Sequence, residues 1–458
     1  FEAAMNDSPT FQELMEKHPE FESTIKVLFK QMRGLSRHAG GVIITENSRE
    51  GMPLIKAGGE LQTPWPEGVN FRHLEEFGLL KFDILGLGTL RMFEQCVRRI
   101  LKKNGVKNPT FRQIKQWFWD NLHPDNNPMT DIKVFENVFW NGNYTGIFQF
   151  INDKTQNFMR QMKPKSVTDI AVATSIFRPG PLSLKVDQRF LNNRANPESV
   201  VYKHPLLREV FAETSGLLVF QEQLQMIYHK LAGVPLEDTD GIRKAFTKKE
   251  INNKEKAQAE RNKLRQSFIE ACGKANNIDP EDCGDIFDEM EKLVAYSFNK
   301  SHAVCYAITT WQCAWFLTYY PDEWVATYID YCAISKGKVT GKEDPKAIAI
   351  KEAKALGYEL TKPDINVSEY EFAVHPTKAK TLVPSFSSLQ HVGKTAVSEI
   401  QQFRPYTSVK DLLVNPDGSW RHSKFNKSAL STLVKLEALG SMDIVGEDKL
   451  FKNYKQVY

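Results

Sequence analysis

The chain has 458 residues, of which 41% are hydrophobic and 25% are charged. This composition is ordinary for a globular protein, and the length excludes a single small core and allows about three or four subdomains. The formal net charge of +4 is too small to indicate a nucleic-acid partner, so only the distribution of charge can do so.

The cysteines and the first residues bear on the compartment. The six cysteines form no Cys-x-x-Cys pair and have no zinc-like spacing, so we expect reduced intracellular thiols. The first seven residues do not resemble a signal peptide, and a start at Phe1 suggests truncation or processing. There is no internal repeat and no low-complexity tract.

The first part of the chain predicts a mixed α/β unit. Residues 1–34 have the spacing of two helices, and Gly41–Thr45 is expected to form a short strand before a loop rich in Gly and Pro. Just before that strand, Arg37 and His38 precede two glycines, which would let the backbone approach a phosphate closely. An ordinary turn is the alternative.

The segment Gly78–Leu90 places one carboxylate on an otherwise apolar strand. Period-two alternation puts Lys81 and Asp83 on one face and apolar side chains on the other, at Leu80, Phe82 and Ile84. A carboxylate on a rigid strand suits a divalent cation, and a surface strand with one solvated aspartate is the alternative. Thr89 is expected to cap the following helix.

From Leu90 to about Lys336 the pattern is mostly helical, with turn clusters that include 178–183 and 233–240. Thr145–Phe150 and Phe177–Leu182 mark a proline-stiffened turn after a helix, and a purely structural corner is the alternative. The latter segment contains Arg178.

Residues 241–265 form a basic run with nine Lys or Arg against three Glu, an excess larger than the net charge of the chain. A charge run on a helix is usually a solvated face. The sequence Asp238-Thr239-Asp240 lies at its start, where we expect it to cap the helix.

Polar donors precede a long apolar helix. Asn299, Lys300 and His302 lie at the expected start of this helix, where exposed helix-terminal amides favour an anion; a polar cap is the alternative. Residues 303–320 carry no charge, but they contain Thr309, Thr310, Gln312 and Thr318. We therefore expect a buried core helix and no membrane span.

The last part of the chain predicts a linker and a set of short elements. Residues 336–346 are polar, a helix is expected over 346–356 with a strand-like pair after it, and 386–442 close with short helices. Leu389–Ala396 has a Val-Gly-x-x-Ala core typical of a helix-hairpin-helix. Gly393 would let backbone amides meet a duplex phosphate, and Lys394 would add charge; a plain helix corner is the alternative.

These segments, taken in order, resemble motifs of the C-family replicative DNA polymerases, the bacterial DNA polymerase III alpha subunits. Lys81–Leu87 is similar to the palm strand that carries the third of three metal-binding aspartates, and it differs at Ile84. Arg37–Val42 is similar to another palm segment. The fingers motifs of the family resemble five further segments, with Thr247 and Ser297 where the family has glycine: Thr145–Phe150, Phe177–Leu182, Gly216–Met226, Gly241–Lys249 and Tyr296–His302.

The resemblance implies a predominantly helical α+β fold with four parts. These are a thumb remnant, the C-terminal part of the palm with its mixed β structure, large helical fingers, and a small α/β duplex- and clamp-side domain with the helix-hairpin-helix. The expected boundaries are 1–35, 36–90, 91–340 and 341–458.

The resemblance also implies template-directed transfer of a deoxynucleotide to a primer 3′ hydroxyl with two Mg²⁺ ions. Asp83 would be the catalytic, metal-binding residue. Six side chains would bind the triphosphate or the primer, namely Arg243, Lys244, Lys248, Asn299, Lys300 and His302. Arg178 would contact a phosphate or the template, and four residues would contact DNA, namely Arg37, His38, Gly393 and Lys394.

One aspartate cannot hold two Mg²⁺ ions, and the other two family aspartates belong to an Asp-x-Asp strand upstream of where this chain begins. We therefore consider a split polymerase with a partner chain, a processed fragment of a longer polypeptide, and a non-catalytic DNA-binding or clamp-loading scaffold. Retention of Asp83 argues against the scaffold. The expected partners are primer-template DNA, dNTPs, the N-terminal palm and a sliding clamp or another replisome protein, and no membrane is expected among them. The expected location is the cytoplasm of a bacterial or virus-infected bacterial cell.

Overall fold

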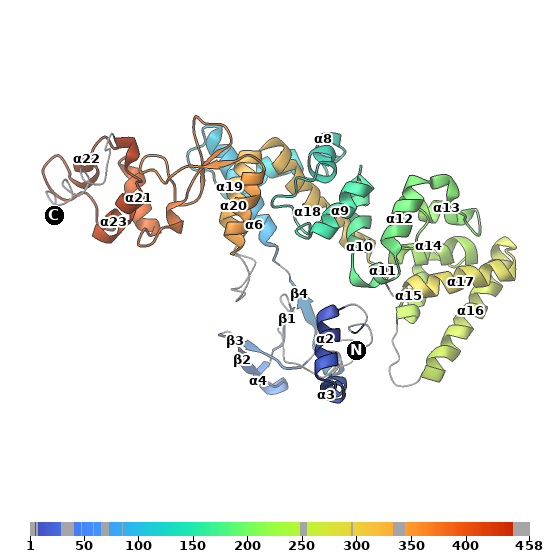
Figure 1. Ribbon diagram of the computed structural model, residues 1–458. Helices are drawn as coiled ribbons and strands as arrows, with labels where there is room; N and C mark the ends of the chain where they lie inside the picture. The colour runs from blue at the N-terminus through green and yellow to red at the C-terminus, as the bar shows by residue number, and fades with distance from the viewer. Residues whose placement is uncertain are drawn as a thin grey trace. The chain divides into compact units, whose positions relative to one another are not determined.

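The structure is a computed structural model that describes most of the chain, drawn in Figure 1. The described residues are 5, 8–28, 41–46, 48–57, 59–65, 73–84, 86–247, 254–294, 296–332 and 344–442. Three of the expected site residues, Arg37, His38 and Lys248, lie outside them. The chain divides into two compact units, Phe1–Gly86 and Leu87–Tyr458, and each is considered by itself.

The first unit combines short helices with two small antiparallel sheets. The two helices expected within 1–34 are confirmed as α2 and α3, and the strand expected at Gly41 is confirmed as the shorter β1. Strands β1 and β4 pair so that Val42 lies opposite Phe82, and β2 pairs with β3. The elements are α2 (Pro9–Lys17), α3 (Phe21–Leu28), β1 (Gly41–Ile43), α4 (Ser48–Gly51), β2 (Ile55–Ala57), β3 (Glu60–Gln62), α5 (His73–Glu76) and β4 (Lys81–Asp83).

This unit buries few apolar side chains among its described residues, namely Met15, Met52 and Leu74. Opposed residues of an antiparallel pair share a face, so Val42 and Phe82 project from the same side of the β1–β4 sheet. Both are exposed, as are Leu80 and Ile84 beside them. The apolar face expected on the β4 strand therefore faces solvent in this chain.

The second unit begins with α6 (Gly88–Lys103), which corrects the expected cap. The N-cap residue is Leu87 and it makes no side-chain cap bond. Thr89 already lies in the first helical turn, and a capping side chain has to come from the residue before the helix. The apolar stripe packs inward at Phe93, Val97 and Ile100.

Helices make up the middle of this unit, and one of them is the expected apolar core helix, α18. The elements are α7 (Phe111–Leu122), α8 (Ile132–Val134), the π-helix η1 (Phe135–Trp140), α9 (Asp153–Met162), α10 (Val167–Ile176), α11 (Pro179–Ser183), α12 (Val186–Ala195), η2 (Pro197–Ser199), α13 (Leu206–Phe211), η3 (Ala212–Thr214), α14 (Gln221–Ala232), η4 (Leu236–Asp238), α15 (Thr239–Thr247), α16 (Lys254–Asn276), α17 (Pro280–Val294), α18 (Lys300–Tyr319) and α19 (Pro321–Tyr331).

One of these elements differs from the sequence prediction. Residues 178–183, expected as a turn, contain the short helix α11, because Pro179 and Pro181 fall in its first turn, where a missing N–H costs nothing. The described residues of the basic run lie in α15 and α16.

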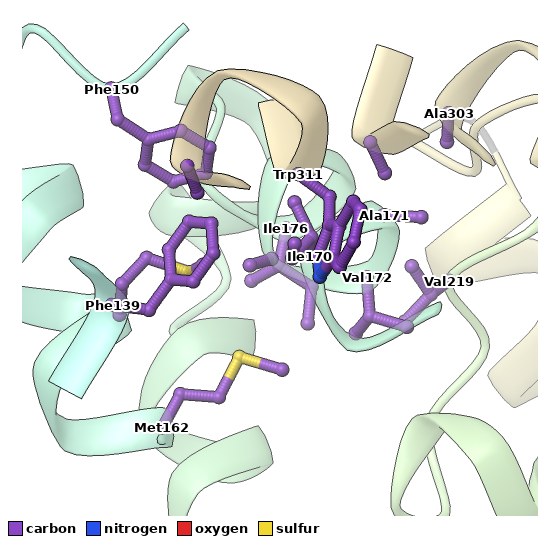
Figure 2. Packing of buried hydrophobic residues seen from close by; sticks show 14 of the residues in the cluster. Phe139, Phe150, Met162, Ile170, Ala171, Val172, Ile176, Val219, Ala303 and Trp311 are labelled. Atoms are coloured by element: carbon purple, nitrogen blue, oxygen red, sulfur yellow. The ribbon is translucent and has the colours of Figure 1, made fainter. Parts of the chain in front are cut away.

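The core of the second unit forms around α18, which packs against α10. Figure 2 shows Trp311 of α18 among side chains of α10 that include Ile170 and Ile176. The buried Gln312 donates its amide to the backbone oxygen of Leu122 at 2.9 Å, so this polar group is satisfied inside the core. None of the helices in the described part of the chain has the length and apolar character for a membrane crossing.

The C-terminal part has a small sheet and a second apolar cluster. The strand order is β5-β7-β6, with β5 parallel and β6 antiparallel to β7. The elements are α20 (Pro345–Ala355), β5 (Glu359–Leu360), β6 (Ala373–Val374), β7 (Thr381–Val383), η5 (Phe386–Ser388), α21 (Lys394–Gln402), α22 (Val409–Leu413), α23 (Lys427–Lys435) and η6 (Gly440–Met442).

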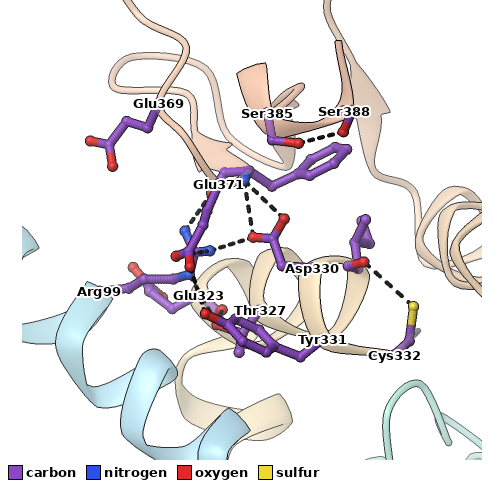
Figure 3. Close-up of polar contacts among 12 residues, drawn as sticks. Arg99, Glu323, Thr327, Asp330, Tyr331, Cys332, Glu369, Glu371, Ser385 and Ser388 are labelled. Atoms are coloured by element: carbon purple, nitrogen blue, oxygen red, sulfur yellow. Dashed lines mark hydrogen bonds and ion pairs between the residues drawn. The ribbon is translucent and has the colours of Figure 1, made fainter. Parts of the chain in front are cut away.

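A buried polar cluster ties this part to the helices (Figure 3). Arg99 of α6 donates to Asp330 of α19 at 2.6 Å and to Thr327 at 3.0 Å. Asp330 also accepts the backbone N–H of Phe372 at 2.9 Å. Burial raises the pKa of Asp330 to about 6, although the Arg99 charge acts in the opposite direction. One guanidinium thus joins α6, α19 and the segment before β6.

Candidate active site

The structure describes the backbone of Asp83 but not its side chain. Asp83 ends β4, where its Cα lies opposite Gly41. The described residues contain no group of three or more His, Cys, Asp or Glu that could hold a metal ion. The predicted metal-binding role of Asp83 therefore stays a prediction, and a two-ion site would need carboxylates beyond these residues.

The two cations of α15 share one internal carboxylate. Asp240 accepts from Arg243 at 2.8 Å and from Lys244 at 2.8 Å. Hydrogen bonds from Lys244 and then from Arg243 lower the pKa of Asp240. Asp240 thus pairs with these cations from within the first turn, so that the expected cap from Asp238–Asp240 would have to come from Asp238, the residue before the helix, which stays a prediction. A triphosphate that binds Arg243 and Lys244 would therefore have to replace the Asp240 carboxylate as their partner.

The first turn of α18 is also occupied by the protein's own acceptors. Asn299 is the N-cap, and its Oδ1 accepts the His302 N–H at 2.8 Å. Glu222 accepts the Lys300 N–H at 2.9 Å, and Glu213 accepts from Lys300 Nζ at 2.6 Å. The expectation that helix-terminal amides are open to an anion here is wrong for Lys300 and His302, because these N–H groups are paired within the chain.

His302 differs from these neighbours. Its side chain is exposed, and its ring lies between those of Phe298 and Tyr306, at centroid distances of 5.5 and 4.5 Å. Among the described residues, none forms a hydrogen bond or ion pair with its ring nitrogens. The side chain is thus exposed and packed against two aromatic rings, which suits contact with a ligand.

Arg178 has a structural use that the sequence did not reveal. Its guanidinium donates to the backbone oxygens of Ser175 at 2.8 Å and Tyr296 at 2.7 Å, and it lies 4.4 Å from the Phe298 ring centroid. Burial lowers its pKa. A Cβ at Gly180 would lie 2.3 Å from a ring carbon of Tyr296, so glycine permits this approach. Arg178 therefore holds α10 and α11 to the segment before α18.

The turn before α14 brings these separate motifs together. The Phe298 N–H donates to Val219 at 2.9 Å, and the Gln221 N–H donates to Phe298 at 2.9 Å. The Gln221 side chain accepts from Arg243 at 3.4 Å. Arg243 of α15 and the first turn of α18 thus both contact the start of α14, and Arg178 contacts the Phe298 ring next to it. Sequence reasoning missed Glu213, Gln221 and Glu222 as contacts, because no spacing signals partners that lie 22 to 87 residues away in the chain.

The second candidate surface is the start of α21. Gly393 is the N-cap of this helix and makes no side-chain cap bond; both Gly393 and Lys394 are exposed. The φ of Gly393 is −78°, and a Cβ there would meet nothing within 4 Å. The fold itself therefore does not require glycine at this position.

A carboxylate of α21 holds the segment that precedes α23. Glu399 accepts the N–H groups of Ser423, Lys424 and Phe425 at 3.2, 2.8 and 2.9 Å. Burial alone would raise its pKa, but these hydrogen bonds, with that of the Ser423 hydroxyl, lower the pKa of Glu399 to about 2.

This contact predicts an acid-sensitive contribution to stability. Because the folded-state pKa lies below the ordinary value, the contribution is present above about pH 4.5 and is lost as the pH falls toward 2. We expect Glu399→Gln to make the free energy of unfolding less dependent on pH in this window, measured by urea titration. Glu359→Gln, at an exposed carboxylate, is the control, and an equal loss of acid dependence there would contradict the assignment.

Three family models match the chain. They are described as the bacterial DNA polymerase III alpha NTPase domain over residues 1–86, the bacterial DNA polymerase III alpha subunit finger domain over 96–274, and a helix-hairpin-helix motif over 357–448. The last agrees with the helix-hairpin-helix expected near Gly393.

Curated relatives match along nearly the whole chain. DNA polymerase III subunit alpha of Xylella fastidiosa (strain Temecula1) is 29% identical over 462 residues, which cover 98% of this chain and 36% of the relative. The Thermus aquaticus subunit is 30% identical over 455 residues, 96% of this chain and 33% of the relative. The Campylobacter jejuni subunit is 28% identical over 448 residues, which cover 95% of this chain and 34% of the relative. The chain thus spans about a third of the length of these relatives.

Proposed function

Because this chain belongs to the C family of replicative DNA polymerases, that of the bacterial DNA polymerase III alpha subunits, we propose that it is part of an enzyme for template-directed DNA synthesis. It would contribute a C-terminal part of the palm, the fingers and a duplex-binding region, with boundaries near 35, 90 and 340. The observation that carries this proposal is a family match over 98% of the chain, which includes the Asp83 strand and the fingers motifs.

In the proposed reaction the primer 3′ hydroxyl attacks the α-phosphate of a dNTP and pyrophosphate leaves. Arg243 and Lys244 bind the triphosphate once their ion pairs with Asp240 break. His302, which packs against two aromatic rings, donates a further hydrogen bond to the nucleotide. Lys248 is also proposed to bind the triphosphate or the primer, and this role rests on the family resemblance. Lys300 and Asn299 hold the first turn of α18, because their side chains already pair with Glu213 and Glu222.

Asp83 would supply one carboxylate to a two-Mg²⁺ site, and the remaining ligands would come from another palm segment, on a partner chain or upstream in a longer polypeptide. When bound, the ions neutralise charge on the transferred phosphate. The exposed apolar face of β1–β4 supports this view, because a two-stranded sheet whose apolar face is open to solvent is marginally stable in water. A sliding clamp or another replisome protein is a further proposed partner.

Primer extension tests the proposal directly. The purified chain is assayed alone and after mixing with a candidate N-terminal palm segment of the same family. We expect extension only in the mixture. Extension by the isolated chain would contradict the need for external carboxylates, and no extension with any such segment, alongside retained DNA binding, would favour a non-catalytic scaffold.

We further propose that the start of α21 binds duplex phosphate without reading sequence. Since Gly393→Ala meets no clash within the fold, it should weaken duplex binding several-fold by blocking close approach of the phosphate while the unfolding temperature changes little. Lys394→Ala should weaken binding similarly for all sequences and lower the slope of log K against log salt by about one.

Fluorescence anisotropy with a labelled duplex at several salt concentrations measures both effects. Lys410→Ala, a charge-matched change elsewhere in the same region, is the control. If Gly393→Ala binds the duplex as tightly as the unmodified chain, the start of α21 is not part of the DNA-binding surface.

A further inference from the structure

The pair Gln221–Glu222 has no part in the proposed reaction, yet it contacts both groups of candidate nucleotide-binding residues. Glu222 accepts the Lys300 N–H through both carboxylate oxygens, at 3.0 and 2.9 Å, and Asn299 Nδ2 at 2.9 Å. Gln221 accepts from Arg243 at 3.4 Å. One dipeptide at the start of α14 thus links the first turn of α18 to α15.

The backbone that carries Glu222 is itself held in place. The buried Gln223 accepts the N–H groups of Val219 and Phe220 at 2.8 and 2.9 Å, and it donates to Thr214 at 2.7 Å. Backbone hydrogen bonds between this turn and Phe298 complete the junction. Rigid support of this kind lets one side chain fix the geometry of another.

The contacts of Glu222 extend to His302 through the helix cap. Asn299 donates to Glu222 with its amide nitrogen and accepts the His302 N–H with its amide oxygen, at 2.8 Å. The rotamer of Asn299 is therefore set by Glu222, and the first turn of α18 presents the His302 ring outward. Both carboxylate oxygens of Glu222 are thus occupied by the Lys300 N–H and the Asn299 amide, and the start of a helix is a favourable place for a negative charge.

We propose that Glu222 is a positioning residue for nucleotide binding, acting through Asn299 and the first turn of α18 on His302. The proposal rests on the proposed polymerase function and deepens it. Glu222 does not touch the nucleotide, and its loss lets the first turn of α18 fray so that His302 no longer has a fixed place.

Amide hydrogen exchange on the full chain gives a first test that needs no activity. Glu222→Ala should speed exchange at residues 300–303, while α10 stays protected. Glu222→Gln, which keeps an acceptor for the Lys300 N–H, should restore most of the protection. Glu209→Gln is the matched control, because that exposed glutamate pairs with Lys230 in the same region. Unchanged exchange in Glu222→Ala would overturn the proposal.

Steady-state kinetics of the reconstituted polymerase give a second test. Since hydrogen bonds to a charged group are involved, we expect Glu222→Ala to raise KM for dNTP roughly tenfold, with kcat and KM for primer-template within about twofold of the unmodified chain. A general structural defect would change all three, and that outcome, or an unchanged dNTP KM, would overturn the proposal. Glu222→Gln should lie close to the unmodified chain.

The two tests separate failure of this inference from failure of the proposed function. If no reconstituted mixture extends a primer, the polymerase proposal fails while hydrogen exchange still decides the role of Glu222. If Glu222→Ala does not fold, Glu222→Asp takes its place, because it keeps the charge and loses the reach across to Lys300. The same increase in exchange and in KM is then expected.

Discussion

Asp83→Asn is expected to lower the rate of primer extension by the reconstituted polymerase roughly 10²–10³-fold or more, without a change in unfolding temperature. Asparagine keeps the size of the side chain and removes the negative charge that a Mg²⁺ ion needs. Because β4 pairs with β1 along its whole length through backbone groups, the strand should form equally well in the variant.

The measurement is single-turnover extension of a labelled primer at saturating dNTP and Mg²⁺. Glu76→Gln is a suitable control, since it removes an exposed carboxylate from the same unit and should leave the rate unchanged. A partial return of activity in Mn²⁺ would support a metal-ligand role. Full activity of Asp83→Asn in Mg²⁺ would show that Asp83 has no part in catalysis and would refute the proposed chemistry while leaving the family membership intact.

Arg99→Ala is expected to have the largest effect on stability, a loss of about 3–5 kcal/mol in the free energy of unfolding. Asp330 is buried, with a side chain only 6% exposed, and Arg99 is its cationic partner at 2.6 Å. Removal of the guanidinium leaves this carboxylate buried without a counter-ion and also takes donors from Thr327 and the backbone of Phe372. This is a large part of the 5–15 kcal/mol that typically stabilises a domain.

The neighbouring ion pair provides a matched control. Arg98 pairs with Glu94 at 3.0 Å on the same helix, but both side chains are about a third exposed. Arg98 also donates to the backbone oxygen of Pro109 at 2.8 Å, so Arg98→Ala should cost about 1–2 kcal/mol, less than Arg99→Ala. Urea unfolding monitored by tryptophan fluorescence measures both variants, and the double variant Arg99→Ala with Asp330→Asn should recover part of the loss. Equal effects of the two arginine substitutions would show that burial of Asp330 does not set the cost.

Sequence pattern predicted the main helical elements, and the family resemblance implied the predominantly helical α+β class. An uncharged stretch with a few polar residues indicated a core helix, and α18 is buried against α10 with its polar side chains bonded inside. Charge counting found the cations of α15, and motif order indicated the polymerase family. These features are local or periodic, so the residue types carry the signal directly.

Tertiary structure decided which charges stay available to a ligand. The sequence indicated that Lys300 and Arg243 are available to bind phosphate. In the fold, however, Lys300 pairs with Glu213, and Arg243 pairs with Asp240. Alternation placed apolar side chains on one face of β4, but only the fold shows that this face has no cover. For Lys300 and for β4 the physical reason is the same. Their ion pairs and burial depend on residues that are distant in the chain, about which composition, spacing and period carry no information. Asp240 differs, because it lies three residues before Arg243 and four before Lys244, and the fold shows only that this local pair forms.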